Sequence, residues 1–315
     1  MNIGFSAPTR GPQATPKSLA QLVQHGEDLG FGIVTVSDHV VFPRAANSTY
    51  PYSEDGSYWG GVECMEQLTL HAYLAACTTS LRLLTSVMVV PHRPPVLTAK
   101  VLATVDVLSG GRLIVGCGAG WLREEFEAIS APDFDRRGAV TNEYIRAFKE
   151  LWTSDEPTFD GEFCSFSNLH FEPKPVQKPH PPIWTGGESP AALRRAGRLA
   201  DKWFPIGTNP TYPVRTPEQL TQSLERVRHH AEEASRDPSD VGVAYSAGMP
   251  SLGEAVQQPD GARRPFTGDS EQVAGDIRGF AEAGVNDMAF RFERGTLEET
   301  LAAMEQFADE VMARV

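Results

Sequence analysis

The chain has 315 residues, of which 41% are hydrophobic, and its 41 acidic and 28 basic side chains leave a net charge of −13. A negative surface repels phosphate backbones and anionic lipid headgroups, so we expect neither a nucleic acid nor a membrane as a partner. The N-terminal stretch lacks the features of an export signal, no run of about 18 apolar residues occurs, and the four cysteines form no CxxC pair, which together favour a cytoplasmic protein with reduced thiols.

Short apolar runs alternate with longer stretches of helical periodicity along the chain. In the first half, the pattern predicts strands at 3–7, 33–37, 81–90 and 112–116, and helices at 16–29, 65–77, 94–108 and 136–151. In the second half, it predicts strands at 182–185, 201–206, 240–246 and 287–292, and helices that begin at 190 and 217 or span 269–283 and 296–312. Each strand is nearly all apolar, as expected for a parallel sheet that is buried on both faces. Eight strands alternating with eight helices predict an α/β fold, a (β/α)8 TIM barrel with residues 1–315 in one domain. An open doubly wound sheet is the alternative, although it usually has fewer strands.

Three segments are too long to be plain connections and are predicted to be insertions. They follow strand 2 (residues 40–62), precede strand 5 as a small hairpin (159–171) and follow strand 7 (249–268). The first contains Tyr50, Tyr52, Tyr58 and Trp59. Aromatic rings in a loop over a barrel mouth suit a lid or an apolar substrate wall, because they supply a large contact area. A satellite packing cluster or an oligomer contact is the alternative.

Chemistry in such a barrel lies at the carboxyl ends of the strands, where Ser37-Asp38-His39 follows strand 2. Adjacent side chains diverge, so one could hold a cofactor while the other faces a substrate. A histidine packed in the core is the alternative for His39. The other histidines share no metal-ligand spacing with it, so we expect no metal site.

Two glycine-rich stretches also follow strands. Gly116-Cys117-Gly118-Ala119-Gly120-Trp121 follows strand 4, and Thr185-Gly186-Gly187-Glu188-Ser189 follows strand 5 and opens a capped helix. Glycines let a ligand approach the backbone, and the free N–H groups at a helix start attract anions, so a cofactor phosphate is plausible there. A tight turn and an ordinary N-capped loop are the alternatives. Glu188 would oppose an anion unless its side chain points away.

Four stretches can be considered as a set: Ser37-Asp38-His39, LLTSVMVVPHRPP at 83–95, LSGGRLIVGCGAGWLREEF at 108–126, and PKPVQKPHPPIWTGGESPAALRRAGRLADKWFP at 173–205. Together they resemble the luciferase-like monooxygenase family, in particular its branch of oxidoreductases that depend on the deazaflavin coenzyme F420. The resemblance is strong over residues 1–205 and rests on length and pattern beyond them.

The resemblance implies a barrel that binds F420, or alternatively FMN, at its carboxyl-end mouth without a metal. It implies a non-prolyl cis peptide at Ser86-Val87 against the cofactor ring, and contact of Asp38 with the polar edge of the ring or with the adjoining side chain. The implied cofactor-binding residues are Asp38, Ser86, Val87, Gly118, Ala119, Gly120, Thr185, Gly186, Gly187 and Ser189.

By the same resemblance, His39 donates or accepts a proton, or stabilises charge that develops during hydride transfer, with the help of Glu124 or of Glu125 in its place. Tyr58, Trp59 and Trp121 would contact the substrate, and the aromatic insertion fits a small apolar organic molecule. The leading hypothesis is hydride transfer between reduced F420 and that substrate. The alternatives are a monooxygenase that uses O2 and FMNH2 from a separate reductase, and a non-catalytic cofactor-binding protein. A homodimer is a further expectation from the resemblance.

Overall fold

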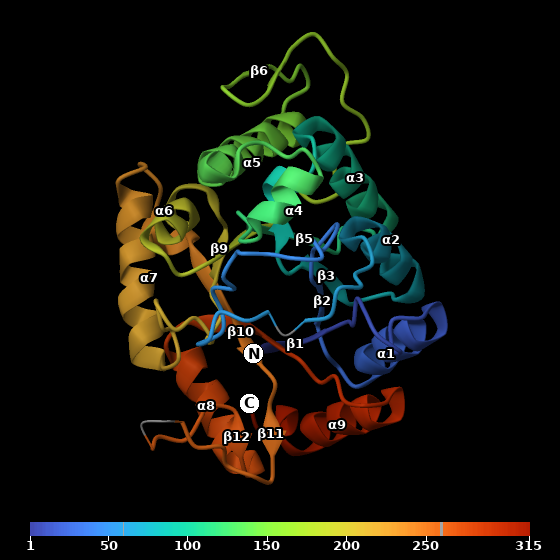
Figure 1. Cartoon of the computed structure of the whole chain (residues 1–315), viewed down its shortest axis with the longest axis vertical. Coiled ribbons are helices and arrows are strands. Elements are labelled where there is room, and N and C mark those ends of the chain that lie inside the picture. The colour runs from blue at the N-terminus through green and yellow to red at the C-terminus, as the bar shows by residue number, and fades with distance from the viewer. Residues whose placement is uncertain (59, 259–260) are drawn as a thin grey trace.

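The computed structural model describes residues 1–58, 60–258 and 261–315. Within these residues, eight barrel strands run parallel and the ring closes through pairing of β3 with β5. Helices surround the strands on all sides (Figure 1). The predicted (β/α)8 TIM barrel is therefore confirmed.

The elements follow the order expected from the sequence. The strands of the barrel are β1 (Asn2–Ser6), β2 (Ile33–Val36), β3 (Arg82–Thr85) with β4 (Met88–Val89), β5 (Leu113–Gly118), β8 (Ile183–Gly186), β9 (Lys202–Phe204), β10 (Gly242–Gly248) and β13 (Val285–Phe290). The helices that cover them are α1 (Pro16–Asp28), α2 (Gln67–Cys77), α3 (Pro95–Leu108), α5 (Arg137–Thr153), α6 (Pro190–Leu199), α7 (Pro217–Glu232), α8 (Ser270–Glu282) and α9 (Leu297–Glu310).

Local chemistry explains where these helices begin. The side chains of Thr15, Ser189, Thr216, Asp269 and Thr296 each accept a hydrogen bond from a backbone N–H in the first turn. Such N-caps satisfy donors that have no partner inside the helix. The capped helix expected at Ser189 is thus confirmed.

Successive side chains along the barrel strands point alternately inward and outward, and they form two separate apolar cores. Side chains that point into the barrel form a small inner cluster, against which Val87 packs: Ile33, Leu84, Ile114, Trp184, Phe204, Ala244 and Ala289. The residues between them point outward and join the larger core beneath the helices. A filled interior leaves the carboxyl-end rim of the barrel as the place for chemistry.

The structure differs from the expected elements in four places. The expected strand at 81–90 is broken into β3 and β4 by a cis peptide between Ser86 and Val87. The strand expected to end at 116 continues to Gly118, and a short helix, α4 (Arg123–Ala128), follows it. The hairpin before β8 is reduced to β6 (Phe159–Asp160) and β7 (Ser165–Phe166). The segment after β10, expected to be irregular, contains a parallel pair, β11 (Ser251–Leu252) and β12 (Thr267–Gly268).

Residues 40–62, apart from Trp59, which lies outside the described residues, are referred to as the strap. Figure 1 shows the strap crossing the middle of the ring of helices. It is held by the Glu124 carboxylate, which accepts hydrogen bonds from the N–H of Asn47 and from the backbone and hydroxyl of Ser48. The insertion expected after strand 2 therefore lies over the barrel.

None of the described helices is long and apolar enough to cross a membrane.

Candidate active site

His39 and Glu125 form a buried pair at the carboxyl end of the barrel. Nδ1 of His39 lies 2.8 Å from Oε2 of Glu125, and the Glu125 side chain is 1% exposed. The other carboxylate oxygen, Oε1, accepts the N–H of Val40 at 2.6 Å and that of Val41 at 3.2 Å. Because a carboxylate can only accept, His39 carries its proton on Nδ1 and leaves Nε2 for a ligand.

The charge state of Glu125 follows from these contacts. Burial raises its pKa, but the hydrogen bond and charge of His39, together with the nearby His92 and the Val40 N–H, lower it by more, so the net pKa lies below the ordinary value. Glu125 is therefore an ionised acceptor that sets the tautomer and orientation of His39.

Glu124, the neighbouring candidate, lies elsewhere. Its carboxylate is bonded to the strap at Asn47 and Ser48, and these bonds lower its pKa to about 2. Of the two adjacent glutamates, the one that contacts His39 is Glu125.

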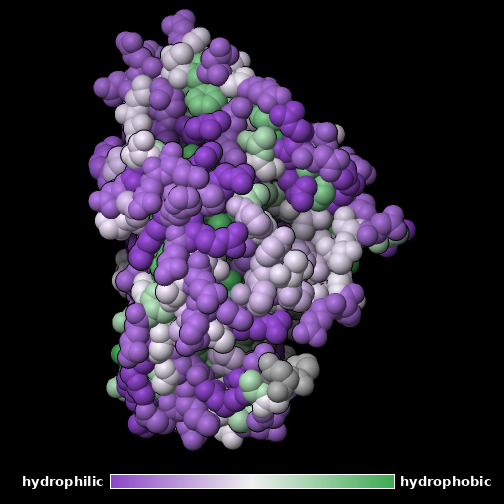
Figure 2. Space-filling model, turned by 90° about the vertical axis from the view of Figure 1, so that its left-hand side faces the viewer, coloured by the Kyte–Doolittle hydropathy of each residue, from purple (hydrophilic) through white to green (hydrophobic). Residues whose placement is uncertain are grey.

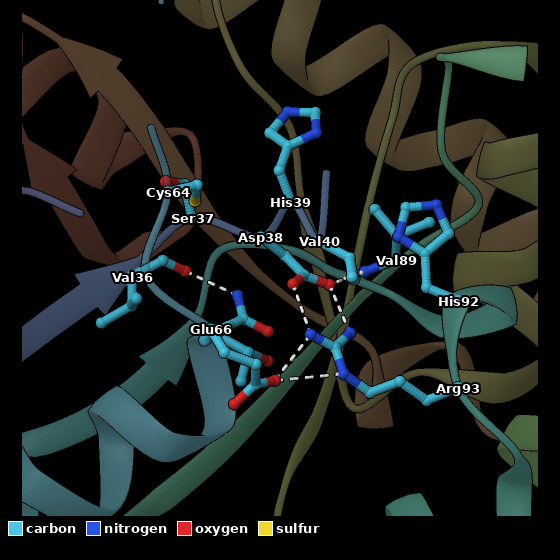
Figure 3. Close-up of polar contacts among 12 residues, drawn as sticks. Val36, Ser37, Asp38, His39, Val40, Cys64, Glu66, Val89, His92 and Arg93 are labelled. Atoms are coloured by element: carbon cyan, nitrogen blue, oxygen red, sulfur yellow. Dashed lines mark hydrogen bonds and ion pairs between the residues drawn. The ribbon is translucent and has the colours of Figure 1, made fainter. Parts of the chain in front are cut away.

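Asp38 points away from His39, as expected for adjacent side chains (Figure 3). Its carboxylate accepts two hydrogen bonds from the Arg93 guanidinium, both at 2.8 Å, and one from the N–H of Val89 at 2.9 Å. Arg93 also contacts Glu66 at 2.7 Å, and the two carboxylates raise the pKa of Arg93 against the opposing effect of burial. Asp38 thus fixes the end of β4 through its bond to the N–H of Val89 and is tied to the side chain of Arg93.

Aromatic rings surround His39 on its open side. The centroid of His39 lies 4.3 Å from that of Phe42, 5.6 Å from that of Tyr58 and 6.2 Å from that of Trp121. Tyr50 joins them 5.0 Å from Trp121, and Arg10 donates to the Tyr58 hydroxyl at 2.6 Å. The predicted substrate residues Tyr58 and Trp121 therefore lie together beside His39, in a wall suited to an apolar molecule.

The two glycine-rich stretches meet around Val87. A Cβ on Gly118 would lie 2.5 Å from Cγ2 of Val87, and one on Gly186 would lie 3.2 Å from Cγ1 of Val87. Gly120 and Gly187 adopt positive φ angles of 85° and 99°, which side chains rarely tolerate. These glycines let β5, β8 and the Ser86-Val87 segment approach one another closely, with Ala119 in the turn that follows β5.

The loop after β8 leads into the capped helix α6. The indole N–H of Trp203 donates to the carbonyl of Gly187 at 2.9 Å. The Glu188 carboxylate points away, because it accepts the N–H of Ile206 and the amide of Asn209, both at 2.8 Å. Thr185 follows Trp184, whose ring lies in the inner cluster, so its own side chain faces the helices.

Several site residues could not be recognised from the sequence. His92, Arg93 and Phe42 lie in or beside quoted motifs, but only the folded chain brings them to Glu125, Asp38 and His39. Trp59, predicted to contact substrate, lies outside the described residues. In the part of the chain that the structure describes, no group of three or more His, Cys, Asp or Glu side chains is placed to hold a metal ion.

A family model described as luciferase-like monooxygenase matches residues 1–314. The chain belongs to this family. An uncharacterised protein of Mycobacterium tuberculosis is 30% identical over 305 residues, which cover 93% of this chain and 94% of the relative. An FMNH2-dependent dimethylsulfone monooxygenase of Pseudomonas putida is 40% identical over 146 residues, which cover 46% of this chain and 40% of that enzyme.

Solved structures show the same fold. An F420-dependent secondary alcohol dehydrogenase in complex with an F420-acetone adduct superposes with a TM-score of 0.78 at 19% identity, covering 100% of this chain and 99% of that chain. Relatives of this chain thus include an enzyme that uses FMNH2, and its fold occurs in an enzyme that uses F420.

Proposed function

We propose that the protein is an oxidoreductase that transfers a hydride between reduced F420 and a small, apolar organic substrate at the mouth of its barrel. The observation that carries the proposal is the His39–Glu125 pair, 2.8 Å apart, beside an aromatic wall, with the adjacent Asp38 bonded to Val89 just after the Val87 segment. A fixed imidazole whose Nε2 faces away from its carboxylate partner suits proton transfer to a molecule in the mouth.

The residues present fit a flavin-type cofactor. The N-terminus of α6, capped by Ser189, and the turned-away carboxylate of Glu188 leave a place for a phosphate, with Gly186 and Gly187 beside it. Val87, Gly118 and Ala119 would line the path from that place to the ring. When bound, F420 supplies a two-electron carrier for hydride exchange.

The chain's own residues then have distinct tasks. His39 would hold or release a proton at Nε2 while Glu125 keeps the ring oriented through Nδ1. Tyr58 and Trp121 would exclude water and press an apolar substrate toward His39. Asp38, tied to Arg93, would keep Val89 and the adjacent Ser86-Val87 segment in place.

A second candidate is a monooxygenase that uses O2 and FMNH2 from a separate reductase. The observation that favours it is the 40% identity to the dimethylsulfone monooxygenase, although this match spans less than half of either chain. A non-catalytic cofactor-binding protein is the minor alternative.

Fluorescence titration of the purified protein with F420 and with FMN separates these candidates. We expect F420 to bind and to be oxidised from its reduced form by acetone as a probe substrate. Binding of FMN alone, with oxidation of dimethylsulfone when FMNH2 and O2 are supplied, would replace the leading proposal by the second. His39→Ala should retain cofactor affinity and lose turnover, whereas unchanged turnover would support the non-catalytic alternative.

We also propose that the chain forms one cytoplasmic domain that assembles as a homodimer through α2 and α3. Leu97 and Leu108 of α3 are 60% and 64% exposed, and Val96 and Val107 of α3 and Tyr73 of α2 are exposed as well. By contrast, Figure 2 shows a mainly hydrophilic face on the side of α7. Exposed apolar side chains on α2 and α3 suit a contact between copies.

A further inference from the structure

A second imidazole approaches Glu125 through the oxygen that His39 does not use. His92 ends the turn after β4 (Val90–His92), and its Nδ1 lies 3.9 Å from Oε1 of Glu125. Both side chains are 1% exposed. This distance is too long for a hydrogen bond, so a bond between the two atoms requires the His92 ring to move closer to Glu125.

His92 is an unexpected residue for this position. Among the described residues, neither ring nitrogen of His92 has a hydrogen-bond partner. One ring neighbour is Phe126, at 4.7 Å between centroids, against which an apolar ring would pack equally well. A buried polar ring that lacks a partner indicates a requirement other than packing.

The groups that face His92 determine its charge. Burial lowers its pKa, and Arg93 and His39 lower it as well, while Glu125 and Asp38 raise it without compensating. His92 is therefore neutral at neutral pH and carries a single N–H. A neutral imidazole with its proton on Nδ1 brings Glu125 a hydrogen-bond donor without a second positive charge.

The active site needs such a donor at one stage of its cycle. While His39 is doubly protonated, its positive charge balances the carboxylate of Glu125. Once His39 has given its Nε2 proton to a molecule in the mouth, the pair carries a net negative charge in a buried place. The carboxylate then depends on its hydrogen-bond donors, of which Val40 and Val41 supply two at Oε1.

We propose that His92 is a positioning residue that donates from Nδ1 to Glu125 in both charge states of His39, and thereby keeps Glu125 ionised and, once His39 is neutral, holds His39 in its Nδ1–H tautomer. Nothing is transferred to or from His92 in this step, because the proton that leaves comes from His39 Nε2. The inference rests on the proposed function only in assigning the proton transfer to His39.

Carbon NMR of protein labelled at the glutamate carboxyl carbon tests the proposal without any cofactor. The Glu125 signal is assigned by its loss in Glu125→Gln. In His92→Phe, we expect the pH at which Glu125 titrates to rise by about one unit, a tenfold gain in proton affinity, because a hydrogen bond to a charged acceptor is lost. His92→Gln, whose amide can still donate, should recover most of that change.

His71→Phe is the matched control. His71 on α2 is equally buried and also has an unpaired Nε2, but its Nδ1 bonds to the carbonyl of Gln67. This variant should leave the titration of Glu125 unchanged. If Glu125 in folded His92→Phe titrates within about 0.2 pH unit of its wild-type value, the proposal is overturned and His92 is a packing residue.

Nitrogen NMR of histidine-labelled wild-type protein gives a decision even if His92→Phe does not fold. The proposal requires the neutral His92 ring to carry its proton on Nδ1, and a ring protonated on Nε2 would refute it. Because neither measurement uses F420 or FMN, failure of cofactor binding would refute the proposed function and leave this inference open to its own test.

Discussion

Glu188 gives the protein a pH-dependent stability that can be measured directly. Its side chain is 3% exposed, and burial raises its pKa to about 7 although Ile206 and Asn209 donate to it. Between pH 4.5 and 7, the folded state therefore keeps a proton on the Glu188 carboxyl group that the unfolded chain has already released. Stability must fall as pH rises through this window. At about 1.4 kcal/mol for each pH unit, the loss amounts to about 3 kcal/mol.

Glu188→Gln removes the titration and keeps the size of the side chain. The new side-chain amide faces the side-chain amide of Asn209, and this contact lowers the free energy of unfolding by an amount that does not depend on pH. We therefore expect the free energy of unfolding of the variant, relative to the wild type, to rise by about 3 kcal/mol between pH 4.5 and pH 8. Urea unfolding followed by tryptophan fluorescence at four pH values in this range measures the difference. A difference that stays constant with pH, or that falls, would refute the assignment of a buried, protonated Glu188.

Three further predictions concern the site and its surroundings. Glu125→Gln should lower turnover of reduced F420 with acetone by about 100-fold or more, whereas Glu124→Gln, its matched control, should stay within about threefold; equal losses would contradict the placement of the two carboxylates. Leu97→Glu combined with Leu108→Glu should convert a dimer into a monomer in light scattering, and a wild-type monomer would remove the dimer proposal. Cofactor affinity should improve with added salt, because the net charge of −13 repels a cofactor phosphate, and a steep loss of affinity would count against binding through backbone N–H groups.

The barrel could be predicted because its determinants are local. Apolar runs of strand length and an N-cap residue such as Ser189 act within a few positions of the chain, and both were found where the pattern placed them. The short helix α4 was missed since its six residues, Arg123–Ala128, carry too little periodicity to stand out. The parallel pair of β11 and β12 joins segments about 15 residues apart through two residues each, which leaves almost no signal in the sequence.

The site was predictable only in part, because its partners come together through the fold. His39 could be proposed from its place after β2, but the choice between Glu124 and Glu125 depends on which face of α4 turns toward the barrel. Adjacent helical residues point about 100° apart, so a one-residue difference sends one carboxylate to His39 and the other to the strap. Arg93 was not singled out, because its bond to Asp38 joins the ends of two different strands.

The strap is fastened at both of its ends by groups that belong to the barrel. At its start, Glu125 accepts the N–H groups of Val40 and Val41, and just beyond its end the N–H of Met65 donates to the carbonyl of Thr9 at 2.9 Å. The two ends of the strap are therefore fixed to the barrel independently of the residues between them. Sequence changes in those residues can remodel the wall that faces a substrate, while the imidazole and carboxylate beneath it keep their geometry. Natural or engineered substitutions in the strap can therefore change which molecules enter the mouth while the His39–Glu125 pair stays in place.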